Sequence, residues 1–137
     1  MKKYLIAVVV LLLVMTGCGN TKKLTCTLEK EKSKEVLTFN YKKDELVKVE
    51  GISTIYANKE VNEEDLALYG EFTCSLLGDE EYIDCSIEPK GKNVEITITM
   101  DLENLTDAEL EEMGYAKENS SYEEMKKDAE EDGYTCK

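Results

Sequence analysis

Histidine, tryptophan and arginine are absent from this 137-residue sequence, and proline occurs once. Without histidine the chain has no imidazole base, no Ser-His or Cys-His dyad and no imidazole ligand for zinc. Without arginine it has no guanidinium to clamp an anion, and it contains neither Gly-x-Ser-x-Gly nor a phosphate-binding glycine-rich loop. Carboxylates are abundant, but none is distinguished by its context. We therefore expect a protein that is not an enzyme and that holds no cofactor and no metal.

Positive charge is also scarce, because 17 lysines stand against 30 acidic residues and give a formal net charge of −13. Such a surface repels nucleic acid and anionic lipid, so we expect no nucleic-acid binding. The acidic residues Glu63, Glu64 and Asp65 do not have the ligand spacing of a calcium loop and fit the start of a solvated helix better. A surface cation-binding domain remains a weaker alternative.

The only long apolar run is short for a membrane span. It covers residues 5–14, follows Lys2 and Lys3, and is followed by the small residues Thr16 and Gly17. These are the three parts of an export signal. A permanent spanning helix needs about 20 apolar residues, so we expect residues 1–17 to be removed.

The sequence Met15-Thr16-Gly17-Cys18 resembles the lipobox of bacterial lipoproteins, although Met15 replaces the usual leucine. The resemblance implies that Cys18 is acylated on sulfur with two chains and becomes the mature N-terminus. Two or more acyl chains give stable anchoring. We therefore expect a lipid-anchored protein on the extracytoplasmic face of the cell membrane, with residues 18–23 as a tether and residues 24–137 as a single domain, which we expect to be monomeric.

Alternation of apolar and polar residues predicts five strands, three before a helix and two after it. Gly51 interrupts the third strand and suggests a bulge there. Two short helices should close the chain, because Thr106 with Glu109 and Ser121 with Glu124 have capping-box spacing. The expected fold is α+β with order β-β-β-α-β-β-α-α, in two layers, with an antiparallel sheet of about five strands and the helices on one face. The strands begin near Leu24, Leu37, Leu46, Ile83 and Val94.

The helix in the middle of the chain should begin at the cap Asn62 and end at Gly78. Its apolar residues recur with helical spacing, which predicts that one face packs on the sheet. Gly70 weakens the helix and suggests a close contact. The residues expected on the buried face are Leu66, Tyr69, Phe72, Thr73, Leu76 and Leu77.

Apart from Cys18, four cysteines remain, an even number that in an exported domain predicts two disulfides. Three pairings are possible. We favour Cys74 with Cys85, which are eleven residues apart across a glycine turn, and Cys26 with Cys136, which would hold the C-terminal segment on the first strand. The alternative left open is four reduced, buried cysteines. Close Cys-x-x-Cys pairs are absent, which disfavours a zinc site and a thiol oxidoreductase.

The mature sequence also resembles the small YehR-like lipoproteins, through Cys26-Thr27, the segment Phe39–Val49, the helix from Asn62 and the closing Asp132–Cys136. This resemblance implies a two-layer α+β domain in a family without an established activity. We interpret the chain as a binding or structural module with an unknown protein partner. An alternative is a precursor whose processed signal fragment, residues 8–17, is a secreted signalling peptide.

Tyrosines offer a candidate contact surface if they are exposed, since each combines apolar area with a polar tip. The three candidates are Tyr82, Tyr115 and Tyr122. Partial burial under the terminal helices is the competing interpretation.

Overall fold

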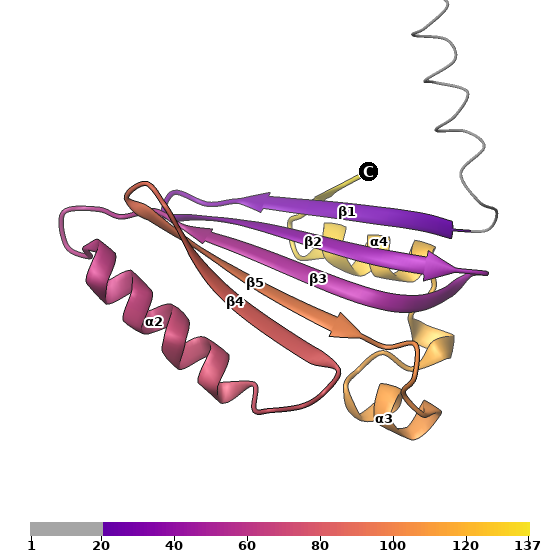
Figure 1. Cartoon of the computed structure of the whole chain (residues 1–137). Helices are drawn as coiled ribbons and strands as arrows, with labels where there is room; N and C mark the ends of the chain where they lie inside the picture. The colour runs from indigo at the N-terminus through magenta and orange to yellow at the C-terminus, as the bar shows by residue number, and fades with distance from the viewer. Residues whose placement is uncertain (1–20) are drawn as a thin grey trace, which may run out of the picture.

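The computed structural model describes residues 21–137 (Figure 1). The predicted export signal, residues 1–17, and the predicted acylation site, Cys18, lie outside the described residues. The elements, in chain order, are β1 (Thr21–Glu29), β2 (Ser33–Lys42), β3 (Glu45–Ile55), α2 (Glu63–Leu76), β4 (Ile83–Lys90), β5 (Asn93–Asp101), α3 (Asp107–Glu112), the 3-10 turn η1 (Lys117–Asn119), α4 (Tyr122–Glu131) and β6 (Thr135–Cys136).

The strands form one antiparallel sheet in the order β4-β5-β3-β2-β1-β6. The predicted α+β class and the β-β-β-α-β-β-α-α order are confirmed, but the sheet has six strands instead of about five. The extra strand, β6, is two residues long and pairs Cys136 with Cys26 on β1. Lys137 and Thr25 also exchange backbone hydrogen bonds of 2.9 and 3.0 Å. Two residues are too few to show an alternating pattern.

The first strand begins at Thr21, three residues before the expected Leu24. Thr21 to Lys23 pair with β2, opposite Lys42, Tyr41 and Asn40. These first residues of β1 are exposed, so hydropathy carries no signal for them. The part of the predicted tether from Thr21 onward therefore belongs to the sheet.

The predicted bulge at Gly51 is absent. The pairing is irregular four residues earlier on the same strand, where Asn40 pairs with Lys48 and Tyr41 with Leu46, so Val47 of β3 is the extra residue. Gly51 pairs in register with Leu37. The turn between β2 and β3 consists of Lys43 and Asp44, which both have positive φ, 53° and 64°. Two such residues suit a tight hairpin, whose twist matches that of the strands.

The three α-helices of residues 21–137 lie against one face of the sheet, as predicted. The register aligns Cys26, Leu37, Gly51, Ile98 and Cys85 across five strands, so these residues share a face. Both hydrophobic clusters are built on that face. The larger cluster packs α3 and α4 against β1 and β2, and the smaller one packs α2 against β4 and β5. Figure 1 shows α2 along the β4 side and α4 beside β1.

The two short terminal helices have the predicted caps. The Thr106 and Ser121 hydroxyls each accept a hydrogen bond from the backbone N–H three residues on, at 3.3 Å, and Glu109 and Glu124 bond back to the caps. After α3, Gly114 has a positive φ of 82°. These reciprocal caps satisfy amide groups that a helix start otherwise leaves unpaired.

Candidate functional site

Helix α2 starts and stops where its sequence predicts. The Asn62 side chain accepts hydrogen bonds from the backbone N–H groups of Glu64 and Asp65, at 2.9 and 3.1 Å. Leu77 is the C-cap of α2, and Gly78 follows it with a φ of 74°. Negative charge in the first turn of α2 is favoured by the helix dipole.

The buried face of α2 differs from the predicted one. Leu66 is 4% exposed and Gly70 is buried, and Cys74, eight residues after Leu66, forms a disulfide with Cys85 on β4. A Cβ atom on Gly70 would lie only 3.1 to 3.3 Å from three side-chain atoms of Ile87. The missing side chain and the disulfide together bring this face of α2 close to β4.

Consequently, four large apolar side chains of α2 are exposed, by 56 to 69%. They recur with helical spacing and form what we call the α2 stripe: Leu68, Tyr69, Phe72 and Leu76. Tyr69, Phe72 and Leu76 were predicted to be buried, and that prediction is wrong. The apolar pattern allows either face of α2 to pack on the sheet. The contact of Gly70 with Ile87 and the Cys74–Cys85 disulfide select the face with Leu66 instead of the predicted one.

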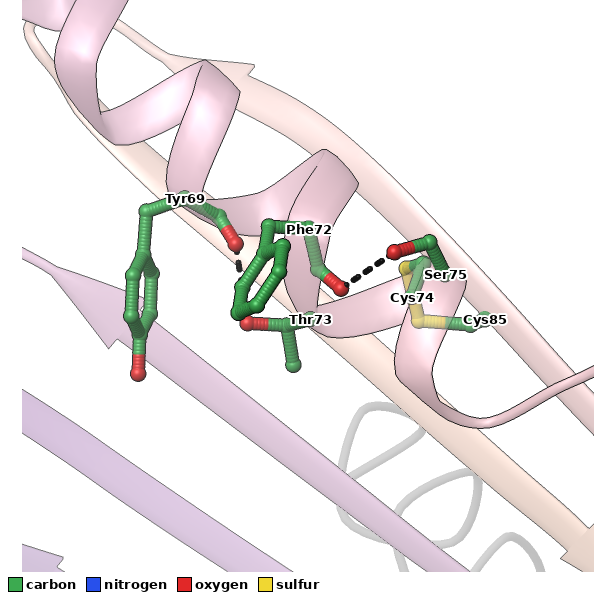
Figure 2. Close-up of a disulfide and its surroundings, with 6 residues drawn as sticks. All are labelled: Tyr69, Phe72, Thr73, Cys74, Ser75 and Cys85. Carbon is green, nitrogen blue, oxygen red and sulfur yellow. Dashed lines mark hydrogen bonds between the residues drawn. A yellow bond between two sulfur atoms is a disulfide. The ribbon is translucent and has the colours of Figure 1, made fainter.

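A groove of about 560 Å³ lies between α2 and the sheet, beside the α2 stripe. Its apolar lining comes chiefly from Ile55, Leu66, Ile96 and Ile98, and Tyr69 borders it. Figure 2 shows Tyr69, Phe72 and Thr73 on the side of α2 that faces β3.

The hydroxyl groups on this part of α2 are turned inward to the helix backbone. Thr73 donates to the carbonyl of Tyr69 at 2.8 Å, and Ser75 donates to the carbonyl of Phe72 at 2.7 Å (Figure 2). These bonds satisfy the hydroxyls within the helix, so neither needs a partner outside it.

Glu35 is an acidic group on the sheet side of the groove. It accepts a hydrogen bond from the Tyr134 hydroxyl at 2.6 Å and forms an ion pair with Lys30 at 3.0 Å. The Tyr134 hydrogen bond and then Lys30 lower the pKa of the Glu35 carboxyl. Desolvation, followed by Glu35, raises the pKa of Tyr134 to about 12. Glu35 is therefore held as a charged group at neutral pH.

The charge around the α2 stripe is strongly one-sided. Residues 60–89 contain ten acidic residues and no basic residue. Asp65 lines the groove, and Glu71, which directly precedes Phe72, lines a separate hollow with Ile87 and Pro89 on the β4 side of α2. One lysine, Lys32, lines the groove from the sheet side. The arrangement is an apolar surface within an acidic segment.

A second hollow, of about 410 Å³, lies between the β2–β3 turn and the α3 region. Two lysines of its lining form ion pairs, Lys42 with Glu103 at 2.8 Å and Lys117 with Asp107 at 3.0 Å. These ion pairs fit a structural role in joining the terminal helices to the sheet.

The tyrosines proposed from sequence do not form one contact surface. Tyr115 and Tyr122 pack against the larger hydrophobic cluster, and the Tyr122 ring lies 5.8 Å from that of Tyr41. Tyr82 directly precedes β4, is half-buried and is not part of that cluster. Among residues 21–137, the exposed aromatic side chains are Tyr69 and Phe72.

The four cysteines among the described residues form two disulfides, Cys26–Cys136 and Cys74–Cys85, which are the two pairs favoured from the sequence. The first joins β1 to β6 and the second joins α2 to β4. Within residues 21–137, no group of three or more Cys, Asp or Glu side chains is arranged to hold a metal ion. In the same range, no helix is long and apolar enough to cross a membrane.

No family model and no curated protein matches this sequence. Two solved structures are similar to it. The Escherichia coli YehR protein has a TM-score of 0.68 at 15% identity, over 86% of this chain and 92% of that one. A protein from Streptococcus pneumoniae TIGR4 has a TM-score of 0.54 at 11% identity, over 88% and 87%. At these identities the likeness concerns the fold alone, and the chain therefore shares its fold with the YehR protein.

Proposed function

We propose that this protein is a lipid-anchored extracytoplasmic binding module that contacts a polypeptide partner through the α2 stripe and the adjacent groove. The observation that carries the proposal is the stripe itself, four large apolar side chains that are 56 to 69% exposed on one helix. Monomeric soluble proteins rarely leave contiguous apolar patches exposed unless the patches bind something.

The cysteines support the extracytoplasmic location. Two disulfides link all four cysteines of residues 21–137, and disulfides persist in oxidising compartments. The lipobox-like Met15–Cys18 supplies the anchor in this proposal, through acyl chains on Cys18.

The position of the groove also fits an anchored module. The described chain begins at Thr21, opposite Lys42, whereas Ser33 and Ile55 line the groove at the other end of these strands. The nine residues of β1 span roughly 26 Å at about 3.3 Å per residue. An anchor just before Thr21 would thus attach to the end of the sheet away from the groove and leave the groove accessible.

Anchoring is tested by the intact mass of the full-length protein purified from membranes. We expect loss of residues 1–17, added acyl mass, and the absence of both changes in a Cys18→Ser variant. An unmodified, uncleaved wild-type protein would refute the anchor.

Binding is tested by placing a photo-crosslinking residue at position 72 in cells and, as a control, at the exposed position 130 on α4. We expect a discrete crosslinked polypeptide from position 72 and none from position 130. Equal crosslinking at both positions would argue against a specific binding face.

A further inference from the structure

The inner face of the sheet is covered at both sides and less so in the middle. Helix α2 packs on β4 and β5, and α4 packs on β1 and β6. Between them, the inward residues Glu35 and Leu37 of β2 and Ser53 and Ile55 of β3 are only half-buried. One further helix laid beside α2 would cover this strip and extend the helical layer.

The stripe has the geometry of a helix-binding surface. Leu68, Phe72 and Leu76 are spaced by four residues, so they form a continuous ridge along α2. Such a ridge beside an apolar groove matches the mode in which an amphipathic helix places its apolar face in a hydrophobic groove.

Charge selects among the possible occupants. A second copy of this chain would bring two α2 helices, each with four acidic residues and no lysine, against one another. An anionic membrane surface is repelled in the same way. A partner with lysine or arginine beside its apolar face is attracted, because Asp65 lines the groove and Glu71 directly precedes Phe72 on the other flank of the α2 stripe.

We infer that the α2 stripe and the groove receive a cationic amphipathic helix, whose apolar face packs on Phe72 and whose basic residues face Asp65 and Glu71. The inference rests on the proposed binding function and adds the chemical class of the partner.

The test uses the full-length protein purified from membranes in nanodiscs of zwitterionic phosphatidylcholine. Acylated and uncleaved chains both insert there, so the binding result does not depend on the outcome of the anchoring test. The probe is a labelled 18-residue helix of leucine and lysine, compared with one in which glutamate replaces lysine. Fluorescence anisotropy reports the dissociation constants, and empty nanodiscs give the background.

We expect the lysine probe to bind at least about tenfold more tightly than the glutamate probe. Opposite charge speeds the encounter of probe and protein and also favours the charge pairs formed in the complex. Phe72→Ser should weaken lysine-probe binding about tenfold, as loss of a central aromatic contact does. This side chain is 60% exposed, so the substitution leaves the fold intact.

Two double variants with the same change in net charge distinguish the effect of overall charge from the effect of the charges beside the α2 stripe. Asp65→Asn with Glu71→Gln on α2 should weaken binding of the lysine probe about fivefold at low salt, because each exposed charge pair contributes modestly and two are removed. Glu123→Gln with Asp128→Asn, at exposed positions on α4, should change it less than twofold.

Three results would overturn the inference. Equal affinity for the two probes would remove the cationic partner while leaving the α2 stripe as a binding face. Equal effects of the α2 and α4 double variants, with no effect of Phe72→Ser, would show adventitious attraction to an acidic surface. Dimerisation in sedimentation velocity that Phe72→Ser abolishes would identify a second copy as the occupant.

Discussion

The orientation of α2 predicts very different losses of folding stability for two substitutions on the same helix. Leu66 is 4% exposed and packs with Val94 and Ile96, whereas Phe72 is 60% exposed. Leu66→Ala should cost about 3 kcal/mol, from lost transfer free energy and the cavity left behind. Phe72→Ala should cost about 0.5 kcal/mol, as for a surface position. The larger side chain thus gives the smaller loss.

Urea unfolding followed by far-ultraviolet circular dichroism measures both costs. With a slope of about 2 kcal/mol per molar urea, Leu66→Ala should lower the midpoint by about 1.5 M and Phe72→Ala by about 0.25 M. The disulfide Cys74–Cys85 must be intact in both variants, because it holds the helix on β4. Equal losses, or a larger loss for Phe72→Ala, would mean that α2 packs with the face predicted by its apolar pattern and would remove the α2 stripe.

Three further predictions concern the parts that hold the site in place. Replacing both Cys26 and Cys136 by serine should lower the free energy of unfolding by about 4–5 kcal/mol, and replacing both Cys74 and Cys85 by about 3 kcal/mol, because the closed loops span 110 and 11 residues. Urea unfolding without reductant compares the two double variants. A larger loss for the second would contradict the entropic argument. Tyr134→Phe should raise the pKa of Glu35, which NMR titration of its carboxyl reports. The pKa of the Glu35 carboxyl is lower in the folded protein than its ordinary value of 4.5. The contribution of Glu35 to stability is therefore fully present above pH 4.5 and is lost as the pH falls through the folded pKa. Tyr134→Phe should accordingly flatten the pH dependence of stability in that acid range. Thr106→Ala should cost about 1 kcal/mol by removing the cap of α3, and a change below the error of thermal unfolding would show that the cap contributes nothing.

Strands and turns were predictable because their signals are local. Val94, Ile96 and Ile98 alternate with polar residues, and that period directs them to one face of β5 whatever the remainder of the chain does. The caps at Asn62, Thr106 and Ser121 depend on residues within one helical turn. Such short-range patterns determine the element order and the side of each strand that is buried.

The face of α2 was not predictable from its pattern, because the deciding contacts come from outside the helix. Gly70 contributes nothing to an apolar pattern, yet its lack of a side chain is what admits Ile87. Cys74 counts as one weakly apolar residue in the pattern, but its bond to Cys85 fixes which side faces β4. The Cys26–Cys136 pair was expected, but the β6 strand itself was not, because its two residues are too few to show an alternating pattern.

An exposed apolar ridge is a hazard for a protein that could meet copies of itself, and the sequence around α2 limits that hazard by charge. Helix α2 carries four acidic residues and no lysine beside the α2 stripe. Like charges repel two such faces at close approach, and salt at physiological concentration screens this repulsion only beyond about 8 Å. The same charges attract a basic partner over that distance. Protection against self-association and preference for a cationic helix therefore have one physical cause, and neutralising Asp65 and Glu71 should weaken both together.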